Sequence, residues 1–244
     1  MKTPSYEERN KEILKAIIED FILTGKPVSS KALSDIFSLS SATIRNVMAD
    51  LERTEYITQP YPSAGRTPTD KGYRLYVNSL MENDSLDKKE KEEIIQGYEK
   101  TKQEEEIIEK TSHFLSSFSH YVGLCLIPQL QKVYLEGFSN LVNQPEFENI
   151  ELLKRLFKIY ENKSLLCEVL MEHLEDEEIS ITIGHENHYE DFYECSVITA
   201  VYKIEDEPGG AIGIIGPKRM PYSHIIPLVK FITNTLSKFL PIKK

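Results

Sequence analysis

Apolar residues in the first fifty positions recur every three or four residues, which is the spacing of one face of an α-helix. The pattern predicts three short helices in succession. The first ends before Gly25 and Pro27, and Ser29 and Ser30 offer an N-cap for the second. The serines of SLSS then end the second helix and cap the third. The residues predicted to face inward are Ile13, Leu14, Ile17, Ile18 and Phe21, then Ala32, Leu33, Ile36 and Phe37, and finally Ile44, Val47, Met48 and Leu51.

The third predicted helix carries an outward face whose side chains suit DNA bases. A guanidinium such as that of Arg45 can bind guanine O6 and N7, and an amide such as that of Asn46 can bind adenine N6 and N7. Three helices joined in this way match helix-turn-helix geometry. The alternative is a small three-helix bundle with a polar face. The predicted base-reading residues are Ala42, Thr43, Arg45 and Asn46.

Two short extended pieces around the small residues of SAG follow the third helix and predict a β-wing. Their prolines cannot donate to a β-ladder, so these strands suit an edge. Thr69 is a fitting N-cap for the helix that starts at Asp70. Arg66 is therefore expected to project from a firmly held loop toward the minor groove or its phosphates, and the plainer alternative is a surface arginine. The predicted DNA-backbone or wing contacts are Ser40, Ser41, Tyr61, Arg66, Lys71 and Arg74.

The remainder of the chain predicts an α+β domain behind a charged helix. Residues 81–118 are rich in lysine and glutamate but keep a sparse apolar stripe, which favours a linker helix over a disordered tether. The expected domains are a winged helix over 1–80, the linker helix over 81–118 and a sheet domain over 119–244. The strand candidates in the last are VGLCLIPQL, ISITIGHE, CSVITAVYKI and GGAIGIIG, and the helix candidates are ENIELLKRLFKIYE, SLLCEVLMEHL and PYSHIIPLVKFITNTLSKFL.

Composition and charge narrow the chemistry. The net charge of −10 argues against a protein that coats polyanions indiscriminately, but residues 29–74 hold six basic against five acidic residues and are the part suited to nucleic acid. Three distant cysteines and six scattered histidines predict buried thiols and no metal set. No catalytic motif is visible, so we predict no enzyme and no cofactor. Neither a membrane-spanning run nor a secretory signal is visible, so a cytoplasmic, nucleoid-associated protein is expected.

Two runs in the first third, SSATIRNVMADLE and QPYPSAGRTPTDKGYRLYVN, resemble the N-terminal winged helix of the heat-inducible transcription repressors, the HrcA family. The SAGR-x-PTDKGYR signature is specific to that family. The central run YVGLCLIPQLQKVYLEGFSNLVNQPEF and the C-terminal run GAIGIIGPKRMPYSHIIPLVKFITNTLS resemble the family as well. The resemblance therefore spans most of the chain.

The resemblance implies a GAF-like C-terminal domain and a dimeric repressor that binds the CIRCE inverted repeat ahead of chaperone operons. It further implies that the GroE chaperonin keeps the repressor active and that heat stress releases the genes. Typical members carry a long additional segment, with an inserted dimerising domain, where this chain runs directly from QLQKVYLEGFSN to LVNQPEF. The sequence thus resembles a short form of the family without that insertion.

Two other functions remain open from the sequence. A winged helix can serve as a protein-docking module without DNA specificity, and the near-neutral charge of residues 29–74 is compatible with that role. A ligand-responsive regulator would share the DNA reader, but a metabolite bound to the C-terminal domain would release it. Binding to specific and scrambled duplexes separates docking from repression, and a response to chaperonin separates the two triggers.

Overall fold

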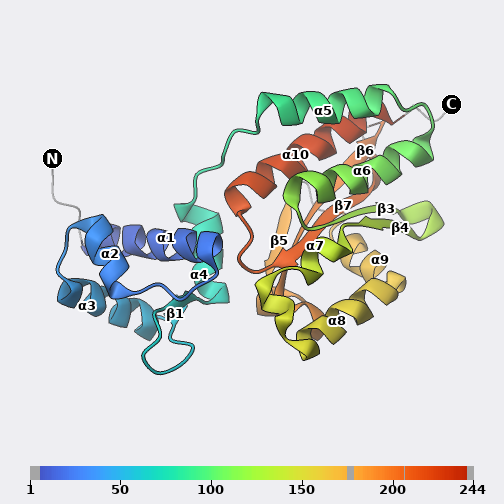
Figure 1. Ribbon diagram of the computed structural model, residues 1–244. Helices are drawn as coiled ribbons and strands as arrows, with labels where there is room; N and C mark the ends of the chain where they lie inside the picture. Colours follow the sequence, from blue (N-terminus) through green and yellow to red (C-terminus); the bar gives the residue numbers. More distant parts are fainter. Residues whose placement is uncertain (1–5, 175–178, 206, 241–244) are drawn as a thin grey trace. The chain divides into compact units, whose positions relative to one another are not determined.

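The computed structural model describes residues 6–174, 179–205 and 207–240, which form helices and antiparallel sheets (Figure 1). This confirms the predicted α+β class. The chain divides into two compact units, Met1–Glu82 and Asn83–Lys244. Over the residues described, we find no helix that is both long and apolar enough to cross a membrane.

Three helices form the core of the first unit. They are α1 (Tyr6–Thr24), α2 (Ser30–Phe37) and α3 (Ser41–Arg53). The predicted caps are present, because the Ser29 and Ser40 hydroxyl oxygens accept hydrogen bonds from the backbone N–H groups of Ala32 and Thr43 at 3.2 and 3.1 Å. Each cap satisfies a backbone donor that has no partner inside its helix. Helices α2 and α3 therefore begin where the sequence predicts.

The short helix α2 differs from its predicted pattern. Leu33 is fully buried, but Ile36 is 63% exposed and Ala32 is exposed as well. A helix of eight residues makes only about two turns, so a narrow stripe of it meets the other helices. The residues predicted to face inward in α1 and α3 are buried, apart from the half-buried Phe21.

A two-stranded wing and a further helix complete the first unit. The strands are β1 (Ile57–Thr58) and β2 (Thr67–Pro68), and after them come α4 (Asp70–Leu75) and the π-helical segment η1 (Tyr76–Leu80). Thr69 caps α4 as predicted, because its hydroxyl oxygen accepts a hydrogen bond from the Gly72 N–H at 3.1 Å. Tyr73 and Tyr76 are buried.

The second unit is built on a five-stranded antiparallel sheet with the strand order β4-β3-β7-β6-β5. The periodicity of the sequence predicts four of these strands but not β4, which has only three apolar or aromatic residues between charged ends and forms an edge of the sheet. The strands are β3 (Val122–Ile127), β4 (Lys132–Glu136), β5 (Ser180–Ile183), β6 (Cys195–Ile204) and β7 (Glu207–Pro217).

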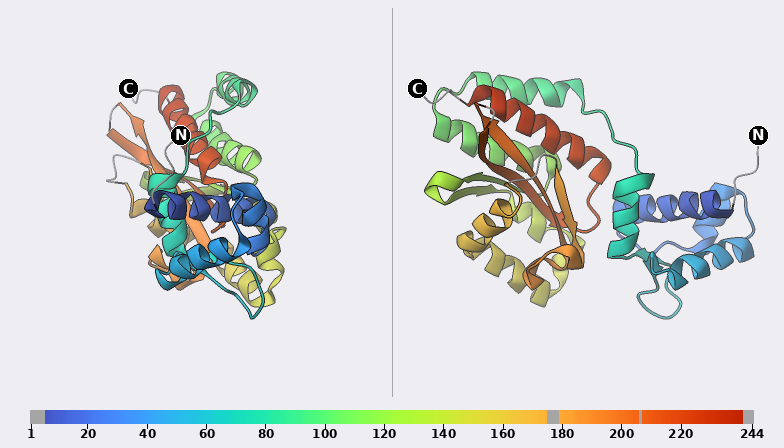
Figure 2. Two further views of the ribbon diagram at one scale, coloured as in Figure 1. Left: turned by 90° about the vertical axis from the view of Figure 1, so that its left-hand side faces the viewer. Right: turned by 180° about the vertical axis from the view of Figure 1, so that it is seen from behind.

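Helices cover both faces of this sheet (Figure 2). Successive strand residues point to opposite faces, so Leu124 belongs to the core cluster with α8 and α9, whereas Gly123 lies against the backbone of α6. The covering helices are α6 (Glu104–Ser119) and α10 (Tyr222–Phe239) on one face, and α8 (Ile150–Glu161) and α9 (Lys163–Met171) on the other. Shorter segments are α7 (Phe138–Val142), η2 (Pro128–Leu130), η3 (Pro145–Glu148), η4 (Gly184–Glu186) and η5 (Glu190–Phe192).

The charged stretch 81–118 contains two helices and not the single linker helix predicted, and residues 81–87 before them are not helical. The first is α5 (Lys88–Glu99), and the second is α6. Tyr98 of α5 is fully buried, stacks on Phe239 with ring centroids 5.5 Å apart and meets the edge of Phe114 at 5.1 Å. The sparse apolar stripe of this stretch is therefore part of the core of the second unit.

Candidate nucleic-acid interface

The N-terminal half of α3 is held in place by hydroxyl groups. The Ser40 hydroxyl caps the helix and also lies 2.9 Å from the Thr43 hydroxyl. The Ser41 hydroxyl lies 3.2 Å from that of Ser30, which joins the first turns of α3 and α2. Beneath them, Ile44 is fully buried. Of the two predicted phosphate contacts, Ser40 therefore caps α3, and Ser41 joins α3 to α2.

The four predicted base-reading residues lie together on this half of α3. Ala42, Arg45 and Asn46 are exposed, and Thr43 is half-buried. Arg45 Nε donates a hydrogen bond to the Ser41 carbonyl oxygen at 3.2 Å, so the side chain lies back along its own helix. The structure thus presents one guanidinium, one amide, one hydroxyl and one methyl group on a rigid, capped helix.

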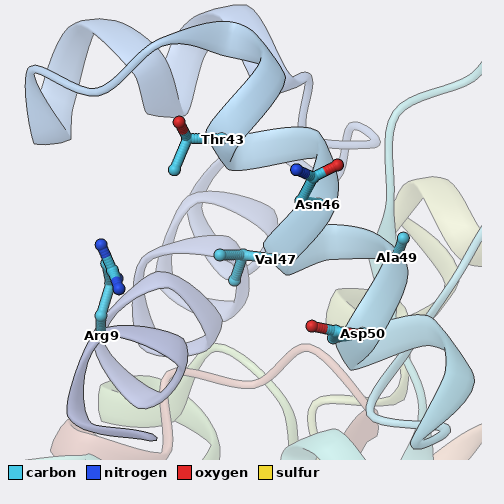
Figure 3. Close-up of a pocket in the computed structure, with 6 residues that line it drawn as sticks. All are labelled: Arg9, Thr43, Asn46, Val47, Ala49 and Asp50. Atoms are coloured by element: carbon cyan, nitrogen blue, oxygen red, sulfur yellow. The ribbon is translucent and has the colours of Figure 1, made fainter. Parts of the chain in front are cut away.

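A groove runs beside this face, between α3 and the first turns of α1 (Figure 3). It has a volume of about 500 Å³. Arg9 of α1 is not among the contacts predicted from the sequence, although it stands four residues before Ile13 and thus continues the stripe by which α1 meets the other helices. The residues that line the groove are Arg9, Thr43, Asn46, Val47, Ala49 and Asp50.

Arg66 does not project from the wing loop as the sequence suggested. Its Nε and Nη2 atoms donate hydrogen bonds to Glu52 Oε2 of α3 at 3.1 and 2.9 Å, and the side chain is only 20% exposed. Its backbone exchanges two hydrogen bonds with Val28, each 2.9 Å long. Arg66 is thus at the base of the wing, where it joins the wing to α3 and to the segment between α1 and α2.

Gly65 supports the same junction through its lack of a side chain. A Cβ atom added there would lie 2.3 Å from the Val28 carbonyl oxygen, far inside van der Waals contact. The SAG run therefore serves two different purposes. Ser63 has a left-handed backbone with φ of 70° and turns the loop, whereas Gly65 lets the returning strand lie against Val28.

The remaining predicted contacts lie elsewhere on the first unit. Tyr61, in the wing loop, is 61% exposed. Lys71 Nζ donates a hydrogen bond to the Thr54 carbonyl oxygen at 3.0 Å, at the C-terminal end of α3 and about 20 Å from its first turn. Arg74 Nη1 donates to Asn78 Oδ1 at 3.4 Å. The predicted residues therefore form one group on the N-terminal half of α3 and a second around its C-terminal end and the wing.

The remaining candidates for chemistry are the cysteines, the possible metal ligands and a hollow in the second unit. All three cysteines are buried thiols. Over the described parts of the chain, no three His, Cys, Asp or Glu residues lie close enough together to hold a metal ion. A hollow of about 180 Å³ in the second unit is lined by Val133, Leu135, Tyr160, Glu161, Lys163 and Leu166.

The fold and the exposed half of α3 define the first unit as a winged helix-turn-helix of the DNA-binding class. Residues 6–82 match the family described as the winged helix-turn-helix transcription repressor, HrcA DNA-binding, and residues 129–226 match the HrcA protein C terminal domain. The chain belongs to the HrcA family of heat-inducible transcription repressors. It is accordingly a DNA-binding transcription regulator and not an enzyme.

Similar proteins match along almost the whole chain. The heat-inducible transcription repressors HrcA of Geobacter sulfurreducens and Desulfitobacterium hafniense are each 30% identical, over 96% and 98% of this chain and 98% and 99% of their own lengths. That of Pelotomaculum thermopropionicum is 29% identical, over 96% of this chain and 97% of its own. A crystal structure of a hypothetical protein has the same fold, with a TM-score of 0.75 at 20% identity over 96% of this chain and 98% of its own.

These relatives are longer than the chain. The alignment with the G. sulfurreducens protein extends over 334 positions, whereas 96% of 244 residues is about 234, so about 100 positions of the alignment have no counterpart here. This agrees with the short form expected from the sequence.

Proposed function

We propose that the protein represses heat-shock (chaperone) genes by binding a CIRCE-type inverted repeat of double-stranded DNA as a homodimer. The observation that carries this proposal is the exposed N-terminal half of α3. It combines Arg45 and Asn46 with the small Ala42 on a helix whose other face is buried in the unit's core. A helix of this composition can lie deep in the major groove and bind base edges there.

In this proposal Arg45 and Asn46 bind purine edges, while Thr43 and Ala42 contact neighbouring bases. Ser40, Ser41 and Tyr61 bind phosphates on either side of the groove, and Lys71 and Arg74 do so near the wing. The contacts of Arg66 with Glu52 and Val28 support a different part for that residue: it fixes the angle of the wing, so that Tyr61 meets the DNA backbone.

Fluorescence anisotropy with two duplexes tests DNA recognition. The full-length protein is titrated onto a CIRCE-type inverted repeat and onto a scrambled duplex of the same composition, across a salt series. We expect tight binding to the repeat and weak binding to the scrambled duplex, with a larger difference at high salt because non-specific binding is mostly electrostatic. Equal, weak binding to both would favour a docking module over a sequence-specific repressor.

Binding to an inverted repeat requires two DNA-binding domains held together in one dimer. A single winged helix buries a small interface on DNA, and two-fold sites match two-fold protein dimers. Sedimentation velocity at the concentrations used for DNA binding measures the oligomeric state directly. A dimer is expected, and a strict monomer on both free protein and DNA complex would rule out the two-fold arrangement.

We propose that the GroE chaperonin maintains the active repressor and that heat diverts it to other unfolded proteins. The hollow in the second unit supports a small-molecule trigger less well, because about 180 Å³ is below the 300–1,000 Å³ typical of ligand pockets. The test is whether added chaperonin raises the fraction of protein that binds the specific duplex after mild heating. A fraction that is unchanged by chaperonin but lowered by a metabolite extract would favour the ligand.

A further inference from the structure

The N-terminal half of α3 has few cations of its own. Among the predicted contacts from Ser40 to Asn46, Arg45 is the one cation. Two other predicted cations are engaged away from this half of the helix, because Arg66 binds Glu52 at the base of the wing and Lys71 binds the Thr54 carbonyl at the far end of α3. A further positive charge for a phosphate beside the first turns of α3 would therefore have to come from another element.

Arg9 supplies that charge from α1. It is the one cation among the six residues that line the groove beside α3. In Figure 3 its guanidinium lies across the groove from Thr43 and Asn46, whereas Asp50 lies farther along α3 toward its C-terminal end. Arg9 is half-buried, and the next turns of α1 are anchored by the fully buried Ile13 and Ile17. The guanidinium is thus presented from a fixed helix.

We propose that Arg9 is a DNA-binding residue that holds one backbone phosphate in the groove between α1 and α3, together with the Thr43 hydroxyl. This inference rests on the proposed function. A guanidinium matches the geometry of phosphate oxygens with two parallel N–H donors, and Thr43 adds a hydroxyl donor. Asp50, which lines the groove farther along α3, is paired with Arg53 at 3.1 Å, so the Arg9 and Thr43 end of the groove is the part that suits a phosphate.

A phosphate contact at Arg9 would fix the position of the protein on the DNA duplex. Phosphate contacts position a protein on the duplex, while base contacts discriminate among sequences. A phosphate bound between Arg9 and Thr43 lies next to Asn46, which lines the same groove. The depth at which α3 enters the major groove is then set from α1, a helix that itself contacts no base.

Salt-dependent binding of variants tests this assignment. Arg9→Gln, Arg9→Lys and the control Lys11→Gln, whose lysine is exposed on α1 and does not line the groove, are compared with the wild type on the specific and scrambled duplexes. Loss of one phosphate contact lowers the slope of log K against log salt by about 0.9 and lowers affinity about five- to tenfold at ~0.1 M salt on both duplexes. We expect this for Arg9→Gln, a smaller loss for Arg9→Lys, and no change for Lys11→Gln.

A tie between α1 and α3 through Asp50 would give a different set of results. Asp50→Asn would then reproduce the effect of Arg9→Gln, with both variants equally destabilised in urea and the salt slope unchanged. That outcome, or an unchanged slope for a fully folded Arg9→Gln, would overturn the proposal. The wild-type curves keep this separate from the proposed function: a wild type that discriminates the two duplexes leaves only the assignment of Arg9 in question.

Discussion

Arg66 shows how one side chain can join three segments of a small domain. Its guanidinium binds Glu52, and its backbone pairs with Val28. Because the two side chains are 20% and 36% exposed, the pair lies between a surface and a buried ion pair. We expect Arg66→Gln to lower the free energy of unfolding of the first unit by about 1–2 kcal/mol.

Urea unfolding followed by circular dichroism measures this loss. Glu52→Gln should cost a similar amount, and the double variant should cost clearly less than the two single losses combined, because each single variant leaves one charge without its partner. Losses that simply add would mean that the two side chains do not stabilise each other.

Arg45, unlike Arg66, should affect DNA binding and not the stability of the fold. Arg45→Ala should lower affinity for the specific duplex by roughly 1–3 kcal/mol and relax base preference at one position, while the stability of the fold stays within about 0.5 kcal/mol because Arg45 is exposed. The matched variant Lys71→Ala should weaken binding to specific and scrambled duplexes equally. Anisotropy on a panel of single-base variants of the repeat distinguishes the two. An unchanged base preference in Arg45→Ala would assign base reading elsewhere.

Two of the buried cysteines should react with thiol reagents only after the protein unfolds. Burial raises the pKa of the Cys195 thiol to about 12 and raises that of Cys125 as well, so both are neutral thiols at pH 8 in the folded protein. The thiolate is the reactive form. A thiol reagent at pH 8 should therefore leave these two unlabelled until urea is added.

The sign of the pH effect on stability follows from the same shift. The pKa of the Cys195 thiol is about 12 in the folded protein, above the value of about 8.5 in the unfolded chain. Its contribution to the free energy of unfolding is therefore fully present below about pH 8.5, and it is lost as the pH rises from about 8.5 toward 12. Mass spectrometry of the labelled protein identifies the site. Rapid labelling of Cys195 in the native protein would contradict its burial.

At the scale of elements, α5 is the least expected component of the core. Tyr98 is fully buried, and its hydroxyl lies 2.8 Å from that of Thr111 on α6. Truncation to Ala should cost about 3–5 kcal/mol, as for other large aromatic residues in cores. The control Lys89→Ala changes an exposed residue whose ion pair with Glu93 is 3.8 Å long, and it should cost less than 0.5 kcal/mol. Thermal unfolding measures the stability of both variants. A mild effect of Tyr98→Ala would mean that α5 is not packed into the core of the second unit.

The helices and strands also show which structural features can be predicted from a single sequence. Helices with strong periodicity, such as α1, and with a capping serine as well, such as α3, could be predicted because their signals are local. The strand β4 could not, because an edge strand with charged ends is defined by its pairing with β3 and not by its own pattern. For the same reason the residues around Tyr98 looked like a solvated linker: their burial depends on Phe114 and Phe239, which are distant in sequence.

The candidate interface follows the same division. The exposed set on α3 could be predicted, because an outward face is the complement of a buried stripe on one helix. The partner of Arg66 and the groove beside Arg9 could not be predicted, because both involve residues of α3 that are at least 14 positions away in the sequence. A charge in a loop suggests a contact with a ligand until its internal partner is known. The family signature around Arg66 is consistent with either role.

On the scale of the whole molecule, the net negative charge is concentrated outside the DNA-binding unit. The net charge of −10 belongs mostly to residues outside the DNA-binding unit, since residues 82–110 alone hold eleven acidic residues against six lysines. Such a distribution lowers non-specific affinity for DNA, because the phosphate backbone repels the acidic parts of the chain. Discrimination between operator and bulk DNA then depends on the few contacts made by the first unit.

The close approach of Gly65 to Val28 has a consequence in genetic terms. Every missense change at this codon adds a Cβ atom where only 2.3 Å separates it from a backbone oxygen. A selection for cells that have lost repression should therefore recover changes at Gly65 as readily as at Arg45. The two kinds of allele should differ in the cell: Gly65 alleles lower the amount of folded protein and recover partly at low growth temperature, whereas Arg45→Ala accumulates normally and stays derepressed.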